Sequence, residues 1–146
     1  MKHRDDDETI VVPTRSKEGR NDSILLSMRV ADDDQCIINA SIGTRSVDVV
    51  GDTFFEALVA LRIRLEALDL LICCMGARAD VYPSPMALSM GNGRLAYRIA
   101  MGRPALSSDL VDIFGVDESC TPATVEEQRA HYERWVYAPK DNKISP

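Results

Sequence analysis

One apolar helical face constrains the fold of this chain more than any other feature of its sequence. Five apolar side chains recur at intervals of four and three residues, which places them on one side of a helix: Phe54, Leu58, Leu61, Leu65 and Leu68. Thr53 and Glu56 have the spacing of a capping box at the start of this helix. Four charged side chains are expected on its solvated side: Arg62, Arg64, Glu66 and Asp69. The apolar face must pack on a sheet, which the flanking β-prone segments predict.

Runs of β-prone residues lie before and after this helix. They predict strands over residues 24–30, 36–42, 46–50, 70–75 and 95–101. The first two runs flank a short acidic connection, so they predict a hairpin. The run 70–75 is apolar on both faces, which predicts a central position in the sheet.

Two further helices are expected near the C-terminus. Residues 109–114 follow two capping serines and end at Gly115, a suitable C-terminal cap. Thr124 and Glu127 form a second capping box, and Trp135 is expected to anchor the helix that follows. The predicted fold class is therefore α+β. It is a single domain with a mostly antiparallel sheet of about five strands, one long helix after the third strand and two C-terminal helices.

Length and composition predict one folded unit with less ordered ends. A chain of 146 residues can bury a self-sufficient core. We expect a mobile charged N-terminal tail over residues 1–23, a single α/β domain over 24–137 and a frayed tail over 138–146. No apolar run reaches the roughly 20 residues of a membrane span, and the charged N-terminus does not resemble a secretion signal. A cytoplasmic protein without membrane contact is expected.

The four cysteines have no spacing typical of a metal site. Cys73 and Cys74 are adjacent, so on a strand they point to opposite faces. In a reducing cytosol we expect all four to be buried, reduced thiols, with no bound zinc and no required disulfide. The sequence predicts no cofactor.

Charge restricts the classes of partner. The net charge of −6 argues against direct nucleic-acid binding, which needs a basic surface. Both ends of the chain are acidic, whereas residues 53–98 are slightly basic and all their basic residues are arginines. Four arginines are candidates for an anion-binding site: Arg78, Arg94, Arg98 and Arg103. Their spacing matches no phosphate-loop motif, so pairing with nearby acids such as Asp80, Asp109 or Asp112 is the favoured interpretation.

Other candidates for chemistry are weaker. His131 is expected on a helix surface, one turn after Glu127, so no catalytic residue is predicted. Asp32, Asp33 and Asp34 are consecutive, and their diverging side chains predict a solvated turn rather than a metal site.

A family resemblance joins segments that lie far apart in the chain. The matching segments, in order, are residues 54–58, 76–86, 93–97, 110–114 and 124–128 through Trp135. They resemble a family of small bacterial cytosolic proteins often encoded beside Rhs-type or contact-dependent polymorphic toxins. The resemblance covers about residues 47–136 and implies a role as cognate immunity protein. The long charged N-terminal segment departs from the compact form of that family, and no catalytic residues are carried over.

Two functions of different classes follow. The first is a non-enzymatic immunity protein that binds and neutralises a cognate toxin domain by covering its active site. Complementary charge would suit a basic toxin, such as a nuclease. Its candidate contact residues are Asp32, Asp33, Asp34, Asp109, Asp112, Glu126 and Glu127. The alternative is a small-anion-binding enzyme or sensor that uses the arginine-rich loop 76–103. The sequence predicts no particular oligomeric state.

Overall fold

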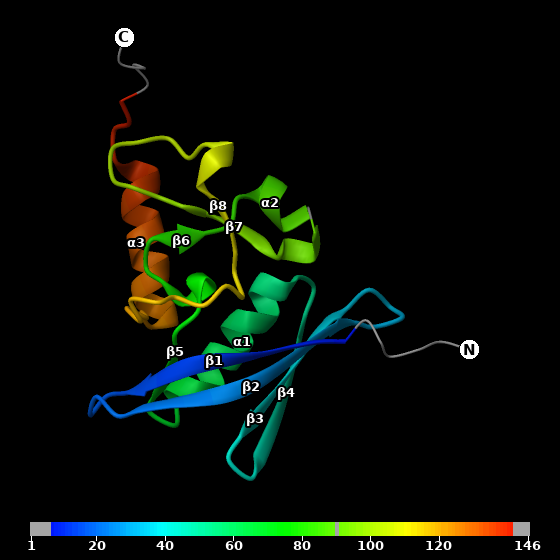
Figure 1. The fold of residues 1–146 in the computed structure, drawn as a ribbon. Helices are drawn as coiled ribbons and strands as arrows, with labels where there is room; N and C mark the ends of the chain where they lie inside the picture. Colours follow the sequence, from blue (N-terminus) through cyan, green and yellow to red (C-terminus); the bar gives the residue numbers. More distant parts are fainter. Residues whose placement is uncertain (1–6, 90, 142–146) are drawn as a thin grey trace.

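The computed structural model describes residues 7–89 and 91–141. Its larger sheet has the strand order β4-β3-β2-β1-β5, and every neighbouring pair is antiparallel. Its strands are β1 (Glu8–Ser16), β2 (Asn21–Val30), β3 (Cys36–Ile42), β4 (Arg45–Gly51) and β5 (Leu70–Ile72). The α+β class and the five-stranded antiparallel sheet are therefore confirmed (Figure 1).

Helix α1 (Phe54–Glu66) packs on one face of this sheet through the predicted apolar stripe. Its innermost leucines are fully buried: Leu58, Leu61 and Leu65. Thr53 Oγ1 accepts a hydrogen bond from the Glu56 N–H, 3.1 Å away. Glu56 Oε1 accepts a hydrogen bond from the Asp52 N–H at 3.2 Å rather than from the Thr53 N–H, so the expected capping box is only half formed. Leu68 lies beyond the end of the helix and is 41% exposed, contrary to its predicted place on the stripe.

The chain after β5 forms a second, three-stranded sheet. Its order is β6-β7-β8, with strands β6 (Val81–Tyr82), β7 (Leu95–Arg98) and β8 (Leu110–Asp112), all antiparallel. The helices near it are α2 (Pro85–Ser89) and α3 (Val125–Tyr137). Three 3-10 turns complete the elements: η1 (Met75–Ala77), η2 (Gly91–Gly93) and η3 (Ser107–Asp109). Figure 1 shows α3 beside β6 and α2 on the other side of this sheet.

The expected mobile tail over residues 1–23 is wrong over most of its length. Residues 8–16 form β1, which lies between β2 and β5, and residues 21–23 begin β2. Val12 and Thr14 are buried. The apolar run at 9–12 is short, but pairing with strands on both sides satisfies the backbone and covers the side chains. Residues 1–6 and 142–146, where disorder and fraying were also predicted, lie outside the described residues.

Non-local pairing also changes the predicted order of elements. The long helix follows the fourth strand rather than the third, because β1 precedes the expected first strand. The strand expected to be central, β5, is at the sheet edge, and β7 belongs to the second sheet. Residues 110–112 form a strand instead of a helix because they pair with β7. In the described chain, α3 is therefore the only C-terminal helix, where two were predicted.

The expectation of four reduced cysteines is wrong for two of them. Cys73 and Cys120 form a disulfide, with Cα atoms 5.0 Å apart, whereas Cys36 and Cys74 are free and buried. The loop before α3 returns to the end of β5, where the Asp117 N–H donates to the Cys73 carbonyl at 3.0 Å. A sequence separation of 47 residues hides this proximity. Within residues 7–89 and 91–141, no helix has the length and apolar character needed to span a membrane.

Candidate functional site

The β2–β3 connection presents three exposed aspartates, as the sequence predicted. Asp32, Asp33 and Asp34 form a turn in which the Ala31 N–H donates to the Gln35 carbonyl at 2.8 Å. Asp33 Oδ1 accepts from the Gln35 N–H at 3.2 Å. Asp34 has φ 68°, a left-handed conformation that Asp tolerates better than most residues. The turn therefore holds the three carboxylates at the end of a long hairpin.

Two more carboxylates lie at the same end of the sheet. Gln35 Nε2 donates to Asp52 Oδ1 at 2.8 Å, which joins the turn to the β4–α1 connection. Burial raises the pKa of the Cys36 thiol, and the charges of Asp34, Asp52 and Glu56 raise it further. The Asp52 carbonyl oxygen lies 4.0 Å from Cys36 Sγ, and Glu56 Oε1 accepts from the Asp52 N–H at 3.2 Å. We define the acidic end as Asp32, Asp33, Asp34, Asp52 and Glu56.

The sequence prediction missed Asp52 and Glu56 as members of this group. Glu56 was assigned only to the helix cap and Asp52 had no predicted role. Their closeness to the hairpin depends on the β3–β4 register. The pairing of Cys36 with Gly51 brings the two connections together.

The other predicted acids do not gather there. Asp109 Oδ2 accepts from the Leu106 N–H at 2.9 Å and caps η3. Asp112 binds Arg94, and Glu127 closes the predicted capping box with Thr124 at the start of α3. Glu126 is exposed in the same turn. In Figure 1 the start of α3 and the β2–β3 connection lie on opposite sides of the molecule. The predicted acids therefore form no single surface.

Arg78 is held by several side chains. Its guanidinium contacts the Asp80 carboxylate at 2.8 and 3.0 Å and Asp117 Oδ1 at 3.0 Å, and it also donates to Ser119 and Thr121. Burial by itself raises the pKa of Asp80, but hydrogen bonding and charge from Arg78 outweigh burial and lower that pKa. Arg78 is therefore a structural link between η1 and the loop before α3.

Of the other candidate arginines, Arg98 shares the Asp80 carboxylate with Arg78, whereas Arg94 and Arg103 have other partners. Arg98 lies 3.7 Å from Asp80, so the predicted pairing holds for this residue too. Arg94 binds Glu8 at 2.6 Å and Asp112 at 3.2 Å, and its guanidinium lies 5.2 Å from the centre of the Phe114 ring. Arg103 contributes its carbonyl oxygen, which accepts from Trp135 Nε1 at 2.9 Å.

A buried polar network was also missed, because Arg62 was expected in solvent. Arg62 is only 2% exposed. Its guanidinium donates to Gln128 Oε1 at 2.6 Å and to the carbonyls of Ala123 and Gly76 at 2.9 and 3.3 Å. The network joins α1 to α3. The sequence indicates the burial of Arg62 only weakly, through its position next to the buried Leu61 on the helix.

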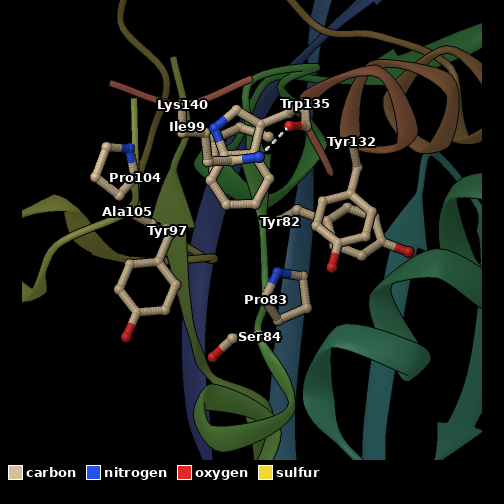
Figure 2. Close-up of a pocket in the computed structure, with 10 residues that line it drawn as sticks. All are labelled: Tyr82, Pro83, Ser84, Tyr97, Ile99, Pro104, Ala105, Tyr132, Trp135 and Lys140. Atoms are coloured by element: carbon tan, nitrogen blue, oxygen red, sulfur yellow. Dashed lines mark hydrogen bonds between the residues drawn. The ribbon is translucent and has the colours of Figure 1, made fainter. Parts of the chain in front are cut away.

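An aromatic cleft of about 240 Å³ lies between the second sheet and α3 (Figure 2). Tyr82 and Tyr97 are register partners in β6 and β7, so their side chains share a face. Tyr132 and Trp135 come from α3. Figure 2 shows Tyr97 on one side, the overlapping rings of Tyr82 and Tyr132 on the other, and Pro83 between them. The sequence could not reveal this cleft because its aromatic residues meet only through strand register and helix packing.

His131 is half-buried in α3 rather than on its surface. Its Nδ1 atom is buried and makes no hydrogen bond within the described residues. Among those residues, no group of three or more His, Cys, Asp or Glu side chains is arranged to hold a metal ion.

No family model matches this chain, and no curated protein matches it.

Proposed function

We propose that this chain is a non-enzymatic immunity protein that binds and neutralises a cognate toxin domain in the bacterial cytoplasm. The resemblance of residues 47–136 to immunity-type proteins motivates the proposal, and the acidic end supports it. Three separate parts of the chain contribute carboxylates to this end: the β2–β3 turn, the β4–α1 connection and the first turn of α1.

The observation that carries the proposal is the lack of compensating charge at the acidic end. Other acids of the fold have cationic partners, such as Glu8 with Arg94 and Asp117 with Arg78. Across residues 7–89 and 91–141, none of the five carboxylates of the acidic end forms an ion pair. A basic partner would supply the missing charge without competing against an internal ion pair.

A nuclease toxin is the partner class that this surface favours. Enzymes that cleave nucleic acid bind phosphates with Lys and Arg side chains, so their active-site regions are basic. Opposite charge on two proteins accelerates their encounter and disfavours wrong partners. A protein bound over the basic substrate site would also exclude the nucleic acid.

The alternative, anion binding by the loop 76–103, has less support. Arg78, Arg94 and Arg98 are already paired with carboxylates, and they belong to two separate groups. An anion would have to displace those acids before it bound.

A growth assay tests the proposed function. The toxin domain encoded beside this chain is expressed in bacteria together with the wild-type chain or a variant. Wild type should restore growth, and Asp32→Lys/Asp33→Lys should restore it less well. The control is Glu18→Lys/Asp22→Lys, which reverses the same number of exposed acids at the opposite end of the β1–β2 hairpin. The control should protect like wild type. Failure of wild type to protect, or equal protection by both variants, would contradict the proposal.

A further inference from the structure

The aromatic cleft is separate from the acidic end. It is built by β6, β7, the segment 104–105 and α3, whereas the acidic end belongs to the larger sheet and the start of α1. The proposed function makes no use of it.

The wall of the cleft is fixed before any ligand arrives. Phe55 is buried in the main core and meets Tyr82 edge to face, with ring centres 5.4 Å apart. Tyr82 stacks on Tyr132 at 4.0 Å, and Tyr132 lies 6.1 Å from Trp135. A continuous row of rings therefore runs from the core to the cleft. Such rigidity lowers the entropic cost of binding.

The outer end of this row is also fixed. Trp135 Nε1 donates to the Arg103 carbonyl at 2.9 Å. Lys140 Nζ lies 4.3 Å from the centre of the Trp135 ring and donates to the Trp135 carbonyl at 2.6 Å. The indole N–H is therefore already used, and recognition at Trp135 must depend on packing against its ring.

The lining selects an apolar ligand with a stiff, ridged surface. Tyrosine rings, Trp135, Ile99 and two prolines supply most of it. The volume is below the roughly 300–1,000 Å³ typical of small-molecule pockets, which suits side chains of an extended segment lying across the opening. Extended proline-containing segments dock in aromatic-lined grooves because their backbone is already ordered.

Charge at the rim of the cleft also restricts the kind of ligand that can bind. Lys140 is the one charged side chain in the lining. Its ammonium group donates to the carbonyls of Trp135, Val136 and Ala138, so it offers a ligand its positive charge rather than a free N–H. A positive charge at this point of the cleft favours a ligand that carries a carboxylate nearby. We propose that the cleft binds an extended, proline-containing segment of a partner protein, with an acidic residue beside Lys140.

Trp135 is the only tryptophan in the chain, so its fluorescence reports on the cleft directly. The probe is a capped peptide with two Pro-x-x-Pro units and one terminal aspartate. Two comparison peptides carry glycine in place of every proline, or lysine in place of the aspartate. We expect a saturable change in Trp135 fluorescence with the first peptide and no saturable change with the glycine peptide. The lysine peptide should bind more weakly than the first peptide.

Two tyrosine variants locate the binding. Tyr97→Ala removes one side of the cleft and should weaken binding about tenfold, the loss typical of a central aromatic contact. Tyr137→Ala is the control, because Tyr137 is an exposed aromatic residue on the same helix as Trp135 but outside this cleft. Melting temperatures confirm that both variants fold. If Tyr97→Ala does not fold, Ala105→Glu takes its place, since it puts a carboxylate in the lining and should also weaken binding.

Several results would overturn the proposal. These are a glycine peptide that binds as well as the proline peptide, no saturable signal with any peptide, or equal weakening by a cleft variant and Tyr137→Ala. The toxin-protection assay does not depend on this result, so the two proposals can fail separately.

Discussion

Replacing Arg62 with methionine tests the buried contact between α1 and α3. Methionine keeps a straight apolar side chain with good helix propensity but removes the guanidinium. The substitution leaves Gln128 Oε1 and the Ala123 carbonyl without the donors that now lie at 2.6 and 2.9 Å. The Gly76 carbonyl keeps its bond from Gln128 Nε2 at 2.9 Å.

Two opposing effects decide how much free energy of unfolding Arg62→Met loses. Each buried acceptor left without a donor costs about 1–3 kcal/mol, and two are affected. Removing a buried charge recovers part of its desolvation cost. Burial already lowers the pKa of Arg62, which is the direction expected for a guanidinium held mainly by neutral groups. We expect a net loss of about 2–4 kcal/mol in the free energy of unfolding.

Urea denaturation followed by Trp135 fluorescence measures this loss. Arg64→Met is the matched control, because Arg64 is an exposed arginine on the same helix, and its effect should stay within about 0.5 kcal/mol. In Arg62→Met/Gln128→Leu, the combined loss should be smaller than the sum of the single losses by about 1–3 kcal/mol. Equal effects of the Arg62 and Arg64 variants, or additive losses in the double variant, would refute the reasoning.

Three further predictions concern the core, the cysteines and acid stability. Leu61→Ala should cost about 2–5 kcal/mol in the same denaturation assay, whereas Ile63→Ala, at an exposed position of α1, should cost far less; similar losses would contradict the packing of α1. Protein isolated without reductant should show two free thiols after denaturation and almost none before, since Cys73 and Cys120 are bonded and the other two cysteines are buried; four thiols would exclude the disulfide. Burial raises the pKa of Asp117, but hydrogen bonds from Thr121, Ser119 and Arg78 outweigh it and lower that pKa, so its stabilising effect is present at neutral pH and is lost as pH falls below about 4. Asp117→Asn should therefore lower stability at pH 7 more than at pH 3, and an equal loss at both values would count against this assignment.

Local patterns predicted the features that depend on neighbours in the sequence. The apolar residues of α1 recur at helical spacing. The hairpin formed by β2 and β3 has a polar turn between two apolar runs. Thr124 and Glu127 are three residues apart, which is the spacing of a capping box. In each case the residues that form the pattern lie within the element or directly beside it. The exposed aspartates of the β2–β3 turn were identified for the same reason.

Features that depend on distant pairing could not be predicted in this way. β1 is short in apolar residues and becomes a strand because β2 and β5 enclose it. Arg62 is buried because the carbonyls of Ala123 and Gly76 and the side chain of Gln128 meet it there. The Tyr82–Tyr97 pair depends on strand register across a connection that contains α2 and η2, and no short turn motif sets that register. None of these partners is identified by residue type alone.

The most direct test of the acidic end is the rate of association with the cognate toxin domain that the proposal requires, measured at two ionic strengths. Screening shortens from about 10 Å at 0.1 M salt to about 3 Å at 1 M, so a rate enhanced by charge must fall as salt rises. Asp32→Lys/Asp33→Lys should associate more slowly than wild type at low salt, and the difference should shrink at high salt. Glu18→Lys/Asp22→Lys should associate at nearly the wild-type rate throughout. If the hairpin variant binds at the wild-type rate at low salt, the acidic end is not the surface that meets the toxin.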